Sequence, residues 1–470
     1  TFTMAVFKKH DVAADMHGIT EGVIWKQMLL FFFPILLGTF FQQLYNTVDA
    51  MVVGKFVGKQ ALAAVGGATG TLVNLIVGFF VGLSSGATVI ISQYFGAREE
   101  NGVSRTVHTA IAMGLGGGLI LSIAGIIVSP AILRLMDTPE EVMAYATTYI
   151  RIYFAGMIPS LIYNIGSGIL RAVGDSKRPL YFLICACLVN IVLDIVLVLY
   201  ANMGVAGAAL ATIFSQAVSA LLVILALLHA TPALRLHWRK IRLHGDLLPR
   251  IIRIGLPAGL QSVMYSLSNL VIQSSINRFG TDMMATWTAY GKLDSFFWMI
   301  ISAFGVTITT FVGQNFGAHK YDRMRKSIRT CLVMATVATL MVTGLLLAFG
   351  ETLYRLFTDE EVVIQKGMQV LRLLAPFYCT YIGVEVFAGT VRGAGDSLIP
   401  MLMTLFGVCV LRVVWVTLIA PMKPEVSFML LSYPITWSFT SILFIIYYFK
   451  GGWLERCERK AGYAHVDGRV

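Results

Sequence analysis

Long apolar stretches separated by short polar connections recur along the whole chain. A helix needs roughly 20 apolar residues to cross about 30 Å of hydrocarbon, and about twelve stretches reach that length. They lie near residues 25–50, 60–92, 105–131, 141–170, 180–200, 204–229, 249–277, 283–314, 326–349, 364–391, 398–420 and 427–450. The pattern therefore predicts an all-α polytopic membrane protein with twelve transmembrane helices.

The composition makes the bilayer the expected solvent of this protein. Hydrophobic residues make up 57% and charged residues 13% of the 470, and the mean hydropathy is +0.76. So few polar side chains cannot cover a soluble globule of this length. The connections are too short to hold an enzyme core, and the six cysteines show no metal-ligand spacing. We therefore expect no enzyme activity, no cofactor and no resident metal.

The net charge of +11 comes from basic residues in alternate connections, which does not indicate a nucleic-acid partner. Basic clusters at 171–178, 235–250 and 320–329 each follow an even-numbered apolar stretch. Positively charged connections face the cytoplasm. This rule places both termini in the cytoplasm and the protein in the plasma (cytoplasmic) membrane, which is the cell inner membrane where two exist.

Two segments of the chain are near copies of each other. Residues 171–176 read Arg-Ala-Val-Gly-Asp-Ser, and residues 392–397, which start 221 positions later, read Arg-Gly-Ala-Gly-Asp-Ser. Pro34 and Pro257, near the start of each half, are 223 positions apart. The chain is therefore an internal duplication. The prolines are hinge candidates, although a static kink explains them equally well.

The duplication predicts two six-helix bundles. We expect an N-lobe at 20–230, a cytoplasmic linker at 231–248 and a C-lobe at 249–452. Six spans per half bring the second copy into the membrane from the same side, so the copies are parallel repeats. Trp238 lies among basic residues of the linker, which indicates a segment at the membrane interface. Repeats of this kind are typical of secondary transporters that rock about a central cavity, and one duplicated unit can operate as a monomer.

A polar stripe follows one face of the first predicted helix. Gln42, Tyr45, Asn46 and Asp49 are spaced i, i+3, i+4, i+7, which puts them on one face. A carboxylate at the bilayer centre costs roughly 2.5 to 3.5 kcal/mol on insertion scales. The stripe therefore indicates either a transport site or hydrogen bonds that hold helices together.

A second polar group lies in the fifth and sixth spans. Asn190 and Asp194 are four residues apart on one helical face, and Thr212 follows small residues that permit close helix approach. Their oxygens are hard ligands of the kind that Na⁺ prefers. Desolvated carboxyl groups close to one another can carry H⁺ instead. A satisfied buried polar cluster is the structural alternative.

The second half lacks these acids and has charges of its own. The repeat offset puts Leu270 to Ile272 opposite Asp49, and Trp415 opposite Asp194. The intramembrane charges of this half are Lys292, Asp294, Glu385 and Arg412. Opposite signs in adjacent helices predict a network of mutual pairs. Alternatively, Glu385 attracts a cationic substrate, with its repeat partner Asn164 on the other wall.

These motifs together resemble the multidrug and toxic compound extrusion (MATE) transporters, over about residues 20–450. The resemblance rests on four segments: Asn46-Thr47-Val48-Asp49, Gln93-Tyr94-Phe95-Gly96-Ala97, Leu170-Arg171-Ala172-Val173-Gly174-Asp175 and Asn190-Ile191-Val192-Leu193-Asp194. It implies two lobes in a V around a central cleft. It also implies an antiporter that exports cationic amphipathic compounds in exchange for H⁺ or Na⁺.

The resemblance also implies roles for residues. Asp49, Asn190, Asp194 and Thr212 match the family's first-lobe ion or proton site, and Gln42 and Tyr45 match positions that line the substrate cleft. One branch of the family carries acids in the seventh and tenth helices, where this chain has Tyr265 and Tyr381. This departure favours coupling through the first lobe.

Other functions predict different residues. A flippase or exporter of a lipid-linked metabolite should line its cavity with basic side chains, but only Lys292 and Arg412 lie at depth. A membrane enzyme needs a catalytic or metal cluster, but His108 and His229, the histidines nearest the spans, have no matching ligands close in sequence. A receptor without transport is a further alternative. The favoured hypothesis is a scheme in which the incoming ion and the exported cation compete for Asp49 and Asp194.

Overall fold

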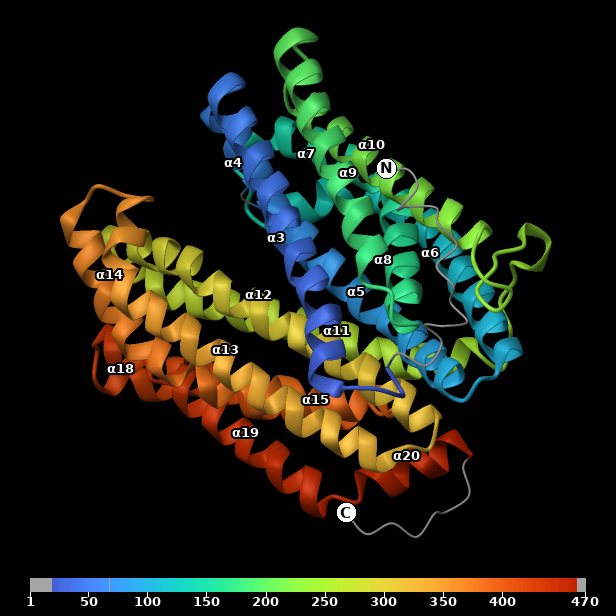
Figure 1. Ribbon diagram of the computed structural model, residues 1–470. Coiled ribbons are helices and arrows are strands. Elements are labelled where there is room, and N and C mark those ends of the chain that lie inside the picture. Colours follow the sequence, from blue (N-terminus) through green and yellow to red (C-terminus); the bar gives the residue numbers. More distant parts are fainter. Residues whose placement is uncertain (1–18, 67, 463–470) are drawn as a thin grey trace. The chain divides into compact units, whose positions relative to one another are not determined.

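The computed structural model describes residues 19–66 and 68–462, so the two termini of the chain lie outside the described residues. The described part consists of helices and their connections, with no strand. Contacts divide the chain into two units (Figure 1). One unit extends to Gly22 and continues over Leu29–Gly259, and the other holds Val23–Met28 and everything from Leu260 onward.

Unit 1 is a bundle in which α10 is the central packing element. Its helices are α3 (Ile24–Phe56), α4 (Lys59–Gly66), α5 (Ala68–Gly96), α6 (Glu100–Leu135), α7 (Glu140–Ala155), α8 (Met157–Ala172), α9 (Lys177–Asp194), the π-helix Ile195–Tyr200 and α10 (Gly204–Leu228). The short 3₁₀ turn Trp238–Lys240 follows in the linker. Helix α10 packs against α7, α8 and α9, and α5 packs against α6 and α8.

Unit 2 is built around α12. Its helices are the second part of α11 (Leu248–Asn277), α12 (Thr281–Gly317), α13 (Tyr321–Arg355), α14 (Glu361–Leu374), the 3₁₀ segment Ala375–Tyr381, α15 (Ile382–Gly393), α16 (Leu398–Thr404), π and short helical turns over Leu405–Met422 that include α17 (Leu411–Val414), α18 (Val426–Leu430), α19 (Ser432–Lys450) and α20 (Trp453–Ala461). Helix α12 packs against α13, α14 and α15, and α15 packs against α19.

The helices coincide with all twelve predicted stretches. Within the described residues, ten segments are long and apolar enough to cross a membrane, and the bent pair α7 and α8 makes an eleventh. Helix α11 occupies the seventh predicted stretch, but Arg250, Arg253 and a series of Ser, Gln and Asn residues make it more polar. The predicted all-α polytopic class is confirmed.

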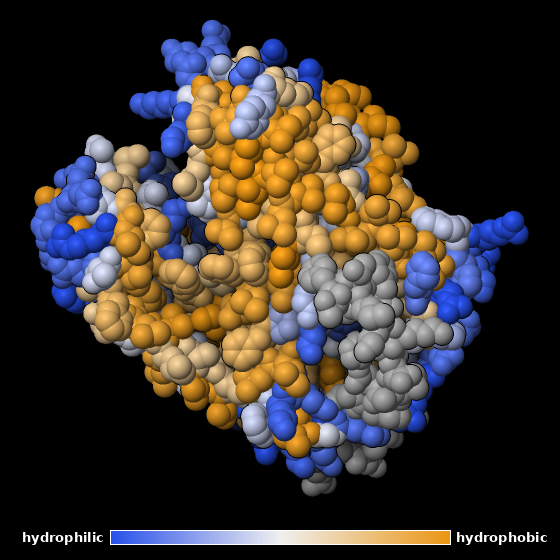
Figure 2. Space-filling model, turned by 45° about the horizontal axis from the view of Figure 1, so that its top comes forward, coloured by the Kyte–Doolittle hydropathy of each residue, from blue (hydrophilic) through white to orange (hydrophobic). Residues whose placement is uncertain are grey.

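The outer surface is suited to lipid. Large apolar side chains such as Ile120, Ile127 and Leu340 are more than half exposed. Figure 2 shows hydrophobic residues over most of the face in view, with hydrophilic residues gathered toward its margins. In water such a surface would associate or precipitate. It therefore fits the protein into a bilayer, as the composition predicts.

The unit boundary falls inside two helices rather than in the linker. It crosses α3 between Met28 and Leu29 and α11 between Gly259 and Leu260. Pro34 and Pro257, the hinge candidates, lie inside these same helices a few residues from each crossing. Unit 1 therefore includes the linker 231–248 and the first turns of α11. It ends at Gly259, after the start that the sequence predicts for the C-lobe at 249.

Glycines let the first part of α11 touch α5 backbone to backbone. A Cβ atom at Gly86 would lie 2.1 Å from the Ile251 carbonyl oxygen, and one at Gly255 would lie 2.1 Å from the Leu83 carbonyl oxygen. Glycines four residues apart on each helix produce this approach. Alanine at either position would have to push the helices apart.

The two copies of the Gly-Asp-Ser turn differ in the basic side chain that pairs with the aspartate. Asp175 accepts hydrogen bonds from the Arg178 backbone N–H and from Arg178 Nε three residues on. Asp396, in the second copy, lies 3.6 Å from Lys460 Nζ of α20. The residue that matches Arg178 by offset is Ile399. The C-terminal helix thus supplies the cation that the local sequence no longer provides.

Candidate functional site in unit 1

The polar stripe of α3 divides into a buried and an exposed part. Asp49 and Tyr45 are buried, 6% and 8% exposed, whereas Gln42 and Asn46 are exposed. The i to i+4 spacing of Tyr45 and Asp49 puts them one turn apart on the same side of the helix. The carboxyl group of Asp49 is therefore held inside the bundle, and the amides lie at its border.

Asp49 meets the predicted polar residues of α9 and α10. The Thr212 hydroxyl lies 3.2 Å from Asp49 Oδ2. With its amide nitrogen turned toward the acids, Asn190 donates to Asp49 Oδ1 at 2.6 Å and to Asp194 Oδ2 at 3.3 Å. Asn190 and Asp194 are fully buried, and Thr212 is 5% exposed. The structure thus brings all four predicted residues into one cluster, here called the carboxyl cluster.

Local sequence explains how three helices come this close. Gly207, Ala208, Ala209 and Ala211 are buried on α10, and a Cβ atom at Gly207 would lie 3.1 Å from the Leu197 backbone. Small residues permit the close contact of α9 and α10. The α-helical pattern of α9 changes to a π-helix immediately after Asp194. Such π turns occur frequently at functional sites.

The charge of the carboxyl cluster is unbalanced by the protein. Among the described residues, no Lys or Arg side chain pairs with Asp49 or Asp194. The Asn190 amide contacts both carboxyl groups, so two like charges lie on either side of one side chain. Asp194 Oδ1 is buried without a hydrogen-bond partner. Two buried carboxylates need a counter-charge, so the cluster fits a bound proton or a small cation.

The oxygen set can serve either ion. The single Thr212 hydrogen can point to Asp49 or to the Ala208 carbonyl oxygen 3.1 Å away, and in the second case its lone pairs face Asp49. Carboxylate, amide and hydroxyl oxygens then form a hard donor set of the kind that suits Na⁺. Among the described residues, no group of three or more His, Cys, Asp and Glu side chains could hold a metal ion, so a transition-metal centre is not indicated there.

Sequence reasoning missed an aromatic wall beside the carboxyl cluster. Tyr149 and Tyr153 of α7 are buried and stack with ring centroids 6.5 Å apart. Tyr149 lies close enough to Asp49 and Asp194 to feel their charges, and Tyr153 lies near Tyr45. The i to i+4 spacing of the two tyrosines in a predicted helix is the signal that could have found them.

The deep charges of unit 2 have aromatic neighbours, and their mutual pairing stays a prediction. Asp294 accepts hydrogen bonds from the Tyr378 hydroxyl at 2.8 Å and from Trp298 Nε1 at 2.7 Å. Arg412 is buried with its guanidinium 4.1 Å from the centroid of the Tyr433 ring. Lys292 is exposed. Aromatic donors and a ring face satisfy the deep charges here, so an ion pair is not required.

Glu385 has a basic neighbour on its own helix. Arg392, seven residues on along α15, lies close enough to interact with its charge. Gly305 of α12 makes room for the carboxyl group, because a Cβ atom there would lie 2.2 Å from Glu385 Oε1. The i to i+7 spacing could have predicted the Arg392 partner.

Two further predicted positions have local contacts. Tyr265 and Tyr381, which replace the acids of one family branch, share a hydrogen bond of 2.8 Å between their hydroxyls. Asn164, the repeat partner of Glu385, donates to the Ser160 carbonyl oxygen at 2.9 Å within α8 of unit 1. The Asn164 side chain thus donates its hydrogen bond within its own helix.

A duplicated, all-helical membrane protein with uncompensated acids inside one bundle has the features of a secondary transporter. A sequence model of the MatE family matches residues 34–196 and 257–418, one match in each half. The chain therefore belongs to the MATE family of multidrug efflux transporters.

Relatives and solved structures agree with this assignment. The chain is 30% identical over 447 residues to "Probable multidrug resistance protein YpnP" of Bacillus subtilis (strain 168), which covers 93% of this chain and 97% of the relative. It is 28% identical over 441 residues to "Probable multidrug resistance protein YoeA" of the same organism, at 92% and 95% coverage. A solved "Outward-facing conformation of a multidrug resistance MATE family transporter of the MOP superfamily" has the same fold, with a TM-score of 0.86, 22% identity and coverage of 95% and 98%.

Proposed function

We propose that this protein is a secondary antiporter that exports cationic amphipathic compounds in exchange for inward H⁺ or Na⁺. The carboxyl cluster of Asp49, Asn190, Asp194 and Thr212 is the coupling-ion site of this proposal. The observation that carries it is the pair of buried carboxyl groups that share one amide without a basic partner. A buried charge of this kind is stable only when a cation accompanies it.

The cluster can couple two fluxes through competition. With H⁺ or Na⁺ bound, Asp49 and Asp194 are neutral as a group and α3 packs against α9 and α10. Without the ion, the carboxylates attract a positively charged substrate. A ligand shifts a conformational equilibrium only as far as it prefers one state. Because ion and substrate need the same negative charge, each binds the state that the other has left.

Substrate breadth follows from the walls of this site. Tyr45, Tyr149 and Tyr153 offer ring faces beside the acids, and aromatic rings attract cations by about 0.5 to 2 kcal/mol. Gln42 and Asn46 add amides at the exposed border. Flat contacts of this kind select for charge and an apolar body rather than for one shape. The names of the relatives, which mention multidrug resistance, agree with such selectivity.

Pro34 gives α3 a possible point of bending. It lies four turns before Asp49 in the same continuous helix, and a proline removes one backbone hydrogen bond. A change in charge at Asp49 can therefore be met by a bend near Pro34. Pro257 occupies the matching place in α11. We propose that these two prolines are the hinges of the transport cycle.

Orientation and assembly are part of the same proposal. The linker carries Arg235, Arg239, Lys240 and Arg242. By the positive-inside rule, the linker and both termini face the cytoplasmic side of the plasma membrane. Each duplicated chain contains both lobes, so we propose a monomer as the working unit.

Gradient-driven transport in proteoliposomes tests this function. Purified protein is reconstituted with ethidium as the cationic probe, and either a pH or a Na⁺ gradient is imposed. Ethidium transport driven by one of the gradients is expected, and its loss in Asp49→Asn. Asp137→Asn, the same chemical change at an exposed acid, is the matched control. Ethidium transport that neither gradient drives, or that Asp49→Asn leaves intact, contradicts the proposal.

A further inference from the structure

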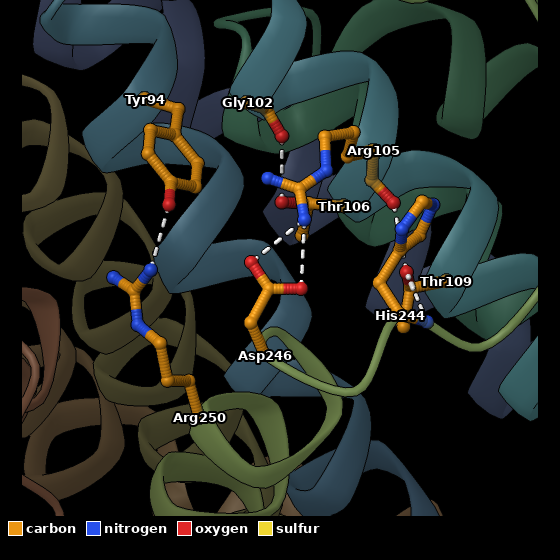
Figure 3. Close-up of polar contacts among 8 residues, drawn as sticks. All are labelled: Tyr94, Gly102, Arg105, Thr106, Thr109, His244, Asp246 and Arg250. Carbon is orange, nitrogen blue, oxygen red and sulfur yellow. Dashed lines mark hydrogen bonds and ion pairs between the residues drawn. The ribbon is translucent and has the colours of Figure 1, made fainter.

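The linker between the repeats is fastened to unit 1 by its inner side (Figure 3). Arg105 Nη2 of α6 donates to both Asp246 carboxylate oxygens at 2.7 Å. The His244 backbone N–H donates to the Thr109 hydroxyl at 3.4 Å. A charge-assisted contact of one guanidinium nitrogen with both carboxylate oxygens is short and holds the carboxylate in place. The linker is therefore a built part of unit 1 and not a loose connection.

Apolar anchors and a histidine complete this attachment. Leu234, Leu236 and Leu247 are 2%, 2% and 0% exposed, and Leu234 and Leu236 join the core cluster of unit 1. The His237 backbone N–H donates to His108 Nε2 at 3.0 Å. With leucines inward at 234, 236 and 247, the exposed side chains at 235, 238–240, 242 and 243 lie on the outer side. The attachment thus gives the linker a fixed outer face.

That outer face combines cations with exposed apolar groups. Trp238 is 60% exposed and Leu243 is 53% exposed. The basic side chains beside them are all exposed: Arg235, Arg239, Lys240 and Arg242. Among the described residues none of these four forms an ion pair, and Asp246, the one acid between 231 and 250, is already bound to Arg105. The face thus has an uncompensated charge of four.

The position of this face places it at the boundary of the hydrocarbon. Helix α10 is a candidate membrane span that ends at Leu228, and α11 begins at Leu248. A tryptophan between basic residues is typical of the interface between lipid and water, where its ring lies at headgroup depth.

We propose that the outer face of the linker, Arg235 to Leu243, binds the headgroups of anionic phospholipids. Phosphate oxygens of the lipid supply the negative charge that the protein does not, and the Trp238 ring and Leu243 enter the upper acyl region. The partner fits by charge, because a zwitterionic headgroup leaves the four cations uncompensated. The binding holds unit 1 at the membrane surface through its fixed linker. It is independent of the carboxyl cluster.

Quenching of Trp238 by brominated lipid tests this proposal on the full-length protein. Protein is reconstituted in phosphatidylcholine vesicles with increasing fractions of brominated phosphatidylglycerol or, in parallel, brominated phosphatidylcholine. The Trp238 signal is the difference between the wild type and Trp238→Phe, since the chain has seven tryptophans. We expect half-maximal quenching at a several-fold lower fraction of phosphatidylglycerol than of phosphatidylcholine.

Charge variants identify the residues responsible. Arg239→Gln/Lys240→Gln/Arg242→Gln should raise the phosphatidylglycerol fraction at half-quenching several-fold, toward that of phosphatidylcholine. Lys55→Gln/Lys59→Gln/Arg134→Gln is the matched control, since these exposed cations lie in connections on the predicted opposite side. This control should keep the preference of the wild type. The substituted side chains are all exposed, so both variants should fold.

Four results overturn the proposal. Trp238 that neither lipid quenches shows that the face does not touch the bilayer. Equal quenching by the two lipids in the wild type removes the charge preference. An equal loss in the two charge variants assigns the effect to net charge alone. Full protection by millimolar inorganic pyrophosphate identifies a soluble polyanion as the ligand instead of the lipid.

Discussion

Asp49 on α3 and Thr212 on α10 are 163 positions apart in the chain, and 3.2 Å separates the Thr212 hydroxyl from Asp49 Oδ2. The contact joins the first helix of the repeat to the sixth, on either side of the buried Asn190 and Asp194 of α9. A hydroxyl in this place stabilises a carboxylate by donation or completes a cation site by its lone pairs. Either use makes Thr212 part of the ion site.

Thr212→Ala should therefore weaken the binding of the coupling ion. A hydrogen bond to a charged group is worth about 1.5 to 3 kcal/mol, so the ion concentration for half-maximal ethidium transport should rise by about 10- to 100-fold. Thr212→Ser keeps the hydroxyl and should remain within about threefold of the wild type. Initial rates over a series of Na⁺ concentrations or pH values measure this. Equal effects of the two substitutions would mean that the hydroxyl is not a ligand.

The contact of α5 and α11 predicts a strong effect on stability. Gly255→Ala puts a methyl group 2.1 Å from the Leu83 carbonyl oxygen, and such overpacking typically costs about 1 to 3 kcal/mol. Thermal unfolding in detergent should show a lower Tm. Gly117→Ala is the control, because nothing lies within 4 Å of a Cβ atom there. A Tm for Gly255→Ala at or above that of the control would show that the helices separate without cost.

Glu385 and Arg392 should be energetically coupled. Both side chains are half-buried and their charges attract each other, so a coupling of about 0.5 to 3 kcal/mol is expected. Glu385→Gln and Arg392→Gln should each lower the free energy of unfolding more than half as much as the double variant does. A double-mutant cycle on unfolding measures this coupling. Additive effects would leave Glu385 free for the alternative role of attracting substrate.

The docking of the linker should depend on pH in two steps. The Arg105 guanidinium lowers the pKa of the Asp246 carboxyl, whereas burial and Arg242 lower the pKa of His244. Both groups bind protons more weakly when the linker is docked. Docking is therefore complete above the unperturbed His value of about 6.5, weakens below it, and weakens again below about 3.9 as Asp246 takes up a proton.

Hydrogen exchange of the His244 amide follows these steps. Its rate, corrected for the intrinsic dependence on pH, should increase relative to an amide in the core of α6 as the pH falls below about 6.5. His244→Gln should reduce this first step, of which His108 carries the rest because its Nε2 must be unprotonated to accept from the His237 N–H, and should keep the second. A protection factor that stays constant between pH 7 and pH 5 would contradict the account of His244.

The sequence predicts the helices and the polar helix faces because both depend on simple periodicity, whereas the grouping of Asp49 with Asn190, Asp194 and Thr212 was implied by the resemblance to the MATE family. Apolar runs fix the spans, and the spacing of Asn190 and Asp194 fixes a shared face. Small residues before Thr212 predict the close approach of α10. The internal repeat predicts the division of the chain into two halves.

Contacts between distant helices could not be predicted in this way. Periodicity tells which face of a helix is polar, but not which aromatic donor faces Asp294 or which ring lies under Arg412. The aromatic partners of these charges were therefore not predicted. The contact of Gly86 with Ile251 depends on a crossing angle that no local pattern contains.

The central claim is that Asp49 and Asp194 hold the coupling cation until substrate displaces it. Purified protein in weakly buffered detergent is titrated with ethidium while pH and free Na⁺ are recorded. The account predicts release of H⁺ or Na⁺ in proportion to the ethidium bound, retained in Asp137→Asn and absent in Asp49→Asn/Asp194→Asn. Ethidium binding to the wild type without release of either ion, or undiminished release from the double variant, would contradict it.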